Sequence, residues 1–186
     1  MAKITGKILR PDILIPHDST DSHSPSKIIL QLGGNLGDVK KTFSDVVSAL
    51  SEEVGKIIKT GSFYKSKAWG FESDDAFTNQ VIELETSLLP HDLLHLTQKI
   101  EKRFGREKKT VDGYESRPVD IDILFYGDSS IETPDLTIPH KLMTERRFVL
   151  EPLREFWSEK KHPRLMKTVK ELYESCPDSS EIIKEE

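Results

Sequence analysis

The chain has 186 residues and a net charge of −5; 35% of its residues are hydrophobic and 32% are charged. This balance is typical of one soluble globular domain and excludes a largely disordered chain. No stretch approaches the roughly 20 apolar residues that a membrane span needs, and Met1 to Arg10 lack the apolar region of a secretion signal. The single cysteine, Cys176, excludes an internal disulfide framework and a cysteine-rich metal site, and it favours a reducing, cytoplasmic setting.

The charges are unevenly distributed along the chain. Residues 99–109 hold six basic residues against two acidic ones, whereas residues 178–186 hold four acidic residues against one basic one. The negative overall charge argues against a protein that binds nucleic acid over its whole surface. The basic segment nevertheless predicts a local site for an anion.

The polar run DSTDSHSPS at residues 18–26 has no apolar periodicity, which predicts a linker. We therefore expect three parts. They are an N-terminal extension over residues 1–26 that is flexible or loosely docked, one domain over residues 27–176, and an acidic tail over residues 177–186 outside that domain.

The first half of the domain contains signals for three strands and one helix. Residues 28–32 are a short apolar run that predicts a strand, and the turn residues 33–38 follow it. Asp38 is a suitable N-cap for a helix over residues 39–53, where apolar side chains recur at helical spacing. A second strand is predicted over residues 57–66 and a third within residues 77–88.

The second half completes a known arrangement. Pro90 starts an amphipathic helix that ends near Gly105, a basic loop covers residues 106–118, and residues 119–126 predict a fourth strand. The order β-α-β-β-α-β is that of a ferredoxin-like α+β fold, an antiparallel sheet with helices packed on one face.

Asp120 and Asp122 are the first candidates for chemistry. They lie two residues apart on a predicted strand, so both carboxylates point to the same face, about 7 Å apart along the backbone. An exposed strand face with alternating polar residues is the alternative interpretation. Two adjacent like charges favour a neutralising cation, and oxygen ligands of this kind suit Mg²⁺ with substrate phosphates.

Basic residues lie near this pair in the sequence. Arg117 precedes it beside the basic loop, and Arg146 and Arg147 follow a segment that contains Thr137 and His140. Carboxylates that hold a metal, with several basic donors nearby, are what phosphoryl transfer requires, because its catalysis consists mainly of positioning and charge neutralisation. Each arginine alone is equally compatible with a solvated surface charge, and His140 with a structural hydrogen bond.

Aromatic and amide residues suggest a second ligand. Trp69 lies in the predicted loop over residues 67–76, Phe77 and Asn79 open the third strand, and Phe148 follows the arginine pair. Such a set could stack a flat heterocycle and hydrogen-bond its edge. Core packing is the alternative for the phenylalanines, whereas a buried Asn must find hydrogen-bond partners.

Together these segments resemble the 6-hydroxymethyl-7,8-dihydropterin pyrophosphokinase (HPPK) family from Lys27 to about Leu165. The similar stretches are LQLGGNLGD, SFYKSKAWG, FTNQVIELET, RPVDIDILF and LTIPHKLMTERRFVLEPL. The resemblance implies transfer of pyrophosphate from ATP to the hydroxymethyl group of a reduced pterin, with release of AMP, in folate biosynthesis. It also implies Mg²⁺ as cofactor, as two ions bound with ATP, and a basic loop that closes over the phosphates.

The resemblance further implies roles for individual residues. Asp120 and Asp122 are expected to hold the metal ions, and Arg106 and Arg117 to act with them in catalysis. The expected ATP-binding residues are Gln98, Glu101, Arg106, Lys108, Arg117, Ile123, Thr137, His140 and Arg146. The expected pterin-binding residues are Ser66, Lys67, Trp69, Phe77, Asn79, Tyr114 and Phe148, with Phe77 and Phe148 as the aromatic sandwich.

Two other functions stay open at this stage. One is a non-catalytic ferredoxin-like module that binds a nucleotide or RNA, which would need aromatic side chains exposed on the sheet and has no use for adjacent carboxylates. The other is a related phosphotransferase with a different heterocyclic acceptor. We expect a cytoplasmic monomer whose partners are ATP and a reduced pterin, without nucleic acid or membrane.

Overall fold

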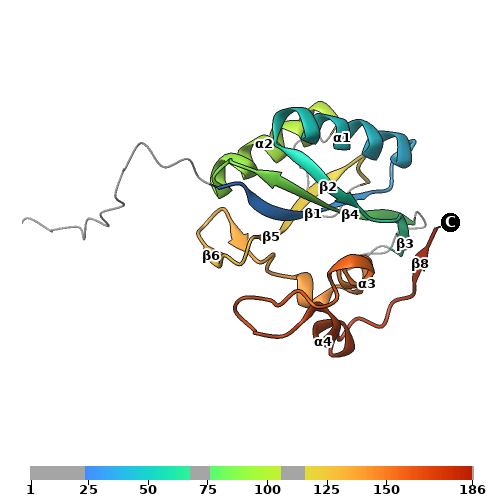
Figure 1. The fold of residues 1–186 in the computed structure, drawn as a ribbon. Helices are drawn as coiled ribbons and strands as arrows, with labels where there is room; N and C mark the ends of the chain where they lie inside the picture. Colours follow the sequence, from blue (N-terminus) through green and yellow to red (C-terminus); the bar gives the residue numbers. More distant parts are fainter. Residues whose placement is uncertain (1–23, 68–75, 106–115, 186) are drawn as a thin grey trace, which may run out of the picture.

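The computed structural model describes residues 24–67, 76–105 and 116–185. It contains a six-stranded antiparallel sheet with helices on both faces and a separate two-stranded sheet, and Figure 1 shows the larger sheet between two helical layers. The helices are α1 (Val39–Glu53), α2 (Pro90–Arg103), α3 (Arg147–Trp157) and α4 (Val169–Glu174). The sheet strands are β1 (Ser26–Gly34), β2 (Lys56–Thr60), β3 (Tyr64–Ser66), β4 (Phe77–Thr86), β5 (Asp120–Tyr126) and β8 (Ile182–Lys184). The remaining elements are β6 (Ile131–Glu132), β7 (Thr137–Ile138) and the 3-10 turn η1 (Met143–Glu145).

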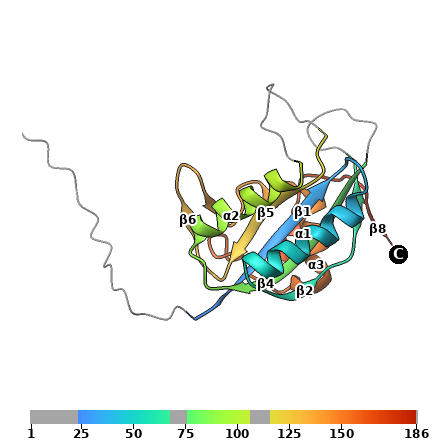
Figure 2. The same ribbon diagram turned by 90° about the horizontal axis from the view of Figure 1, so that it is seen from above.

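The strand order confirms the ferredoxin-like arrangement. The central strand β1 pairs with β5 on one side and β4 on the other, and β2 pairs with β4, all antiparallel. Seen from above, α1 and α2 lie across the same face of this sheet (Figure 2). None of the helices in the described ranges is long and apolar enough to cross a membrane.

The segment over residues 57–66 differs from the prediction, because it forms two strands instead of one. β2 pairs with the second half of β4, whereas β3 pairs with its start at Phe77–Asn79. Between them the chain is held by Gly61, whose N–H donates to the Val81 carbonyl (2.8 Å) and whose carbonyl accepts from Gln80 Nε2 (2.9 Å). The strand is interrupted here, and β3 then pairs with the end of β4 that carries Asn79.

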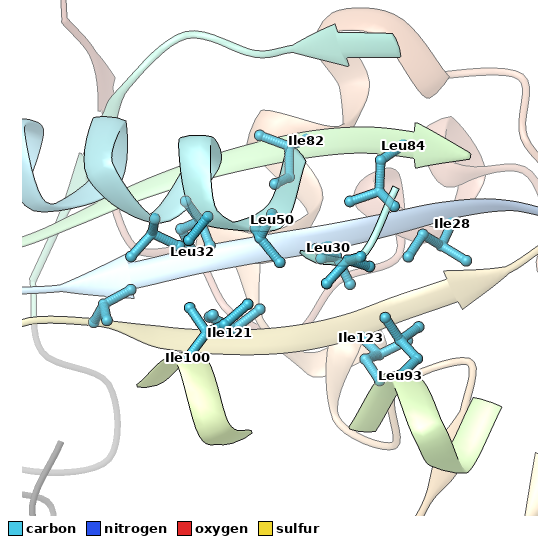
Figure 3. Close-up of a cluster of buried hydrophobic side chains, with 14 of the residues drawn as sticks. Ile28, Leu30, Leu32, Leu50, Ile82, Leu84, Leu93, Ile100, Ile121 and Ile123 are labelled. Atoms are coloured by element: carbon cyan, nitrogen blue, oxygen red, sulfur yellow. The ribbon is translucent and has the colours of Figure 1, made fainter. Parts of the chain in front are cut away.

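The larger core lies between the sheet and the layer of α1 and α2. Alternate residues of β1 point into it, and Figure 3 shows Leu30 and Leu32 among side chains from α1, α2 and β5. Asp38 caps α1 by accepting a hydrogen bond from the Lys41 N–H (3.1 Å), as the sequence predicts. Each fully buried leucine or isoleucine here contributes roughly 1.5–3 kcal/mol, so this cluster fixes the plane of the sheet.

A second core covers the opposite face, for which the sequence predicted no helix. Ile29, Val81 and Leu124 from the sheet pack against α3 and α4. α3 carries the internal Pro152, a residue that normally argues against a helix, which explains why its apolar spacing was not assigned. The prediction of helices on one face was therefore wrong, and the face that carries the polar candidates is itself partly covered by α3.

The acidic segment after residue 176 was expected to lie outside the domain, but β8 within it extends the sheet. β8 pairs with β3 in the register Ser66 with Ile182 and Tyr64 with Lys184. Its charges find partners on the domain: Glu185 lies 3.3 Å from Lys40 and 3.6 Å from Lys65. The backbone pairing with β3 joins this segment to the domain and these ion pairs accompany it, and a composition count reveals neither.

Glu155 on α3 ties β8 to the loop between β2 and β3. Its carboxylate accepts from the Ser62 N–H (2.8 Å), the Ser62 hydroxyl (2.6 Å) and Lys184 Nζ (2.8 Å). We expect Glu155→Gln to lower the free energy of unfolding by about 2 kcal/mol at pH 7, because hydrogen bonds to a charged group are weakened. Urea denaturation measures this change, and Glu159→Gln, at an exposed position of the same region, is the control.

The same variant gives a pH dependence of defined sign. Burial alone would raise the pKa of Glu155, but the hydrogen bonds from Lys184 and Ser62 lower it below the ordinary value of 4.5. A lowered pKa in the folded state contributes stability that is complete above the unfolded value and is lost as pH falls through the folded value. The difference between wild type and Glu155→Gln should therefore be largest above pH 4.5 and shrink below it. A difference that grows toward acid pH would contradict this account.

Candidate active site

The candidate residues meet on the α3 face of the sheet, at the end where β1 stops. In the register of the three central strands, Gly33 lies directly between Asn79 on β4 and Asp120 on β5. Directly opposed residues of antiparallel strands point to the same face, and two strand spacings separate Asn79 from Asp120 by about 10 Å. Gly33 has no side chain, so it places no atoms of its own between the amide and the carboxylate.

Asp120 and Asp122 share this face of β5, as the alternation of the strand predicts. Asp120 is partly buried, with 21% of its side chain exposed, and it forms an ion pair with Arg117. Asp122 lies directly opposite Gln31 on β1. At the outer edge of the same strand, Glu101 of α2 accepts a hydrogen bond from the Ile121 N–H (2.7 Å). This bond fixes the backbone between the two aspartates.

Asn35 is a residue whose role the sequence did not reveal. Its side-chain Oδ1 accepts from the Arg117 N–H (2.8 Å), and the Asn35 and Leu36 N–H groups donate to the Arg117 carbonyl (3.0 and 3.2 Å). The turn after β1 thereby holds the residue that precedes β5 and fixes where the carboxylate pair begins. The signal for it was the run Gly-Gly-Asn, which predicted only a turn.

His140 and Arg146 lie on the carboxylate side, beyond β7. The His140 N–H donates to the Leu124 carbonyl (3.2 Å), and its Nδ1 accepts from the Leu142 N–H (3.3 Å). Burial lowers the pKa of His140, and Arg146 also lowers it. The carboxylates of Asp122 and Asp120 raise it but do not offset the burial, so His140 is mainly neutral at pH 7. His140 is thus within electrostatic range of both aspartates and of Arg146.

The amide side of the site is a hydrogen-bonded group. Asn79, which is 2% exposed, donates from Nδ2 to the Ser66 hydroxyl (3.0 Å) and accepts at Oδ1 from Gln31 Nε2 (3.2 Å). Gln31 also donates to the backbone carbonyl of Phe148 (3.3 Å). Phe77 is half-buried and points to the same face as Asn79, two residues along β4.

Arg147, the second residue of the Arg146–Arg147 pair, contacts other parts of the chain. The Arg147 N–H donates to Asp178 (2.9 Å), and its guanidinium lies 4.2 Å from the ring of Tyr173 and bonds the Tyr173 hydroxyl. Arg147 therefore joins α3 to α4 and to the C-terminal segment. Arg146, which is buried with its guanidinium 5.7 Å from the Phe148 ring, remains with the candidate site.

Other predicted residues are placed elsewhere or lie outside the described residues. Gln98, Glu101 and Ile123 lie on the α2 side of the sheet, Gln98 exposed and Ile123 within the core, and their contact with a nucleotide stays a prediction. Thr137 is half-buried in β7, and Lys67 is exposed at the end of β3. Trp69, Arg106, Lys108 and Tyr114 fall in ranges that the structure does not describe.

The described residues contain no group of three or more His, Cys, Asp or Glu side chains that could hold a metal ion by themselves. Two carboxylates on one strand are nevertheless the donor set of a cation that takes its other ligands from phosphates and water. The residues present therefore fit Mg²⁺ bound together with a polyphosphate.

A surface depression of about 510 Å³ lies at the other end of the sheet, where β1 begins. It is lined by residues that include Pro25, Val54, Lys56 and Leu88. Seven residues of β1 separate this end from Gly33, a distance of roughly 24 Å. The depression is therefore separate from the candidate active site.

Comparison with known proteins identifies the family. The family described as 7,8-dihydro-6-hydroxymethylpterin-pyrophosphokinase (HPPK) matches residues 29–158. A 2-amino-4-hydroxy-6-hydroxymethyldihydropteridine pyrophosphokinase of Porphyromonas gingivalis is 41% identical over 130 residues, which are 69% of this chain and 88% of that protein. One of Aquifex aeolicus with the same name is 40% identical over 144 residues, 77% of this chain and 88% of that protein.

A solved structure supports the fold. A triple mutant of Plasmodium falciparum HPPK-DHPS superposes with a TM-score of 0.68 at 18% identity, over 84% of this chain. This chain spans only 45% of that longer protein. The likeness at this identity concerns the fold alone.

The ferredoxin-like sheet and its group of carboxylates and basic residues define an enzyme of the phosphotransfer class. The chain belongs to the HPPK family. Its activity is that of a 2-amino-4-hydroxy-6-hydroxymethyldihydropteridine pyrophosphokinase: it transfers pyrophosphate from ATP to the hydroxymethyl group of the pterin, releasing AMP, in folate biosynthesis. The alternatives of a non-catalytic binding module and of a different heterocyclic acceptor are thereby set aside.

Proposed function

We propose that ATP and the pterin bind on the two sides of Gly33, with the phosphates toward Asp120 and Asp122 and the heterocycle toward Asn79. The observation that carries this proposal is the row Asn79, Gly33, Asp120 across three adjacent strands. The separation of about 10 Å leaves room for the hydroxymethyl group to approach a phosphate between the two side chains. Holding both reactants in this way supplies much of the catalysis of phosphoryl-group transfer.

On the carboxylate side, Asp120 and Asp122 would hold two Mg²⁺ ions together with ATP. Bound Mg²⁺ neutralises phosphate charge and stabilises the entering and leaving oxygens. One of the two aspartates accepts a hydrogen bond from the attacking hydroxyl and orients it. Arg117 and Arg146 place positive charge beside the phosphates, and neutral His140 offers Nε2 as a hydrogen-bonding atom.

Further residues are proposed to bind ATP. Thr137 contributes a hydroxyl near His140. On the family resemblance, Gln98 and Glu101 of α2 and Ile123 of β5 are proposed as further ATP residues, and so are Arg106 and Lys108, which lie outside the described residues.

On the amide side, Asn79 recognises the edge of the pterin. One hydrogen on Nδ2 and one lone pair on Oδ1 remain after the bonds to Ser66 and Gln31. A donor and an acceptor side by side match the lactam edge of a pterin. Phe77 and Phe148 would sandwich the ring. Lys67, Trp69 and Tyr114 are proposed as further pterin residues.

The enzyme is proposed to act as a monomer in the cytoplasm. The single Cys176 is the usage expected of a protein in a reducing compartment.

The direct experiment is incubation of the protein with ATP, Mg²⁺ and 6-hydroxymethyl-7,8-dihydropterin, with chromatographic measurement of the nucleotide products. We expect AMP in amounts equal to the pterin diphosphate formed, and no reaction when EDTA removes Mg²⁺. Release of ADP would point to transfer of a single phosphoryl group. Turnover in the presence of EDTA would contradict the metal assignment.

A further inference from the structure

Gln31 is a buried amide on the central strand, next to the proposed pterin site. It is 2% exposed and points to the α3 face, where its direct cross-strand neighbours are Val81 on β4 and Asp122 on β5. In the sequence it lies within the apolar run of residues 28–32, which predicts a strand but no role for this residue. A buried amide among apolar side chains must be hydrogen-bonded or it destabilises the fold.

The orientation of the Gln31 amide is set by the backbone of α3. Its Nε2 donates to the Phe148 carbonyl (3.3 Å), and a backbone carbonyl can only accept. A flipped amide would place Oε1 against that carbonyl, with two acceptors facing each other. Nε2 must therefore face Phe148, and its second N–H reaches Asn79 Oδ1 (3.2 Å).

This orientation is transmitted to Asn79. Because Nε2 of Gln31 can only donate, the atom of Asn79 that faces it must be Oδ1, and Nδ2 then faces the Ser66 hydroxyl (3.0 Å). Ser66 alone could not fix Asn79, since a hydroxyl both donates and accepts. The Phe148 carbonyl therefore sets the orientation of the Gln31 amide, and Gln31 in turn sets the orientation of the Asn79 amide. This decides which side of Asn79 offers a ligand a donor and which offers an acceptor.

We propose that Gln31 is a positioning residue for pterin recognition, which fixes the amide orientation of Asn79 and ties it to the chain that carries the Phe148 ring. The inference rests on the proposed pterin site. A pterin lactam edge can place its N–H against Oδ1 of Asn79 and its carbonyl oxygen against Nδ2 without any rotation of the Asn79 amide. A ligand with donor and acceptor exchanged would place two donors and two acceptors against each other. Gln31 touches neither reactant and acts through Asn79.

The chain offers a matched control in Gln80. It is also a buried glutamine, at 5% exposure, and its Nε2 also donates to a backbone carbonyl, that of Gly61 (2.9 Å). It alternates with Asn79 and Val81 along β4 and so points to the opposite face. Gln80→Leu removes a buried amide of the same kind without touching the Asn79 group.

The test measures the KM for the pterin, the KM for ATP and the midpoint of thermal unfolding for Gln31→Leu, Gln31→Met and Gln80→Leu. Loss of one hydrogen bond that orients a recognition group should raise the pterin KM about five- to tenfold for both Gln31 variants. The ATP KM should stay within about twofold, and Gln80→Leu should change stability but not the pterin KM. Two variants of different shape keep the test valid where one of them folds poorly.

A double-mutant cycle separates positioning from a general loss of structure. In an Asn79→Ala background, Gln31→Leu should cause no further rise in the pterin KM, because Gln31 then has nothing to orient. A further rise in the pterin KM of the same size in that background, or an equal rise in the KM for ATP, would overturn the proposal.

Binding of 6-hydroxymethylpterin to the wild type, followed by fluorescence, tests the proposed pterin site itself. Failure of the wild type to bind it would refute the proposed pterin site itself.

Discussion

We expect Asp122→Asn to lower pterin-dependent AMP formation by about 1,000-fold or more, with little change in the temperature of unfolding. The substitution keeps the shape of the side chain and removes only the charge, so the packing of β5 is preserved. Loss of one preorganised charged group from such a site costs about this much in turnover. Asp120→Asn should show a loss of similar size, with some destabilisation, because it also removes the ion pair with Arg117.

The control for this experiment is Asp128→Asn. Asp128 follows β5 by two residues, its side chain is 89% exposed, and it pairs with Lys160. Its removal changes the net charge by the same amount, and we expect turnover within about twofold of the wild type, as for most surface substitutions. Near-normal turnover in both active-site variants at saturating Mg²⁺ would refute the assignment of Asp120 and Asp122.

The second large effect concerns the space over Gly33. Among the described residues, a Cβ atom built there meets only Asn79 Oδ1, at the ordinary contact distance of 3.6 Å, so Gly33→Ala should fold and keep much of its activity. Valine suits a strand but extends two methyl groups into the space between Asn79 and Asp120. We expect Gly33→Val to lower kcat/KM for the pterin about 100-fold, the size of effect that follows when reactants are misplaced by about 1 Å.

Comparison of Gly33→Ala with Gly33→Val distinguishes obstruction of the proposed site from destabilisation of strand β1. Thermal unfolding should place both Gly33 variants close to the wild type, and calorimetry with ATP and Mg²⁺ should give nucleotide binding by Gly33→Val within a few-fold. If Gly33→Val instead keeps full activity, the pterin does not pass between Asn79 and Asp120. If it loses ATP binding to the same degree as pterin binding, the two reactants do not lie on opposite sides of Gly33.

Much of the fold follows from local sequence signals. The helix predicted over residues 39–53 is present as α1 with the same bounds, because Asp38 supplies its cap and the apolar spacing is regular. The break between β2 and β3 was missed because it depends on Gly61 contacting Val81, twenty residues away. α3 has apolar side chains at helical spacing but contains Pro152, which argues against a helix, and β8 has only three residues.

The candidate site also contains some residues that the sequence predicts and others that only the structure reveals. Asp120 and Asp122 can be proposed from the sequence because alternation along one strand is a local property. The functions proposed for Gly33 and Gln31, and the contact of Asn35 with Arg117, depend on which residue lies opposite on the neighbouring strand or loop. Periodicity identifies the face to which a side chain points but not its cross-strand neighbour, so these three residues could be recognised only from the register.

The position of β8 has a practical consequence for following the reaction. Ile182 is paired with Ser66, whose hydroxyl bonds Asn79, so the end of the described chain lies beside the proposed pterin site. The first described residues lie at the start of β1, at the opposite end of the sheet (Figure 1). A fluorescent label attached behind Glu185 would therefore serve as a reporter of pterin binding, whereas the same label at Ser26, at the start of β1, would lie far from the site and serve as its control.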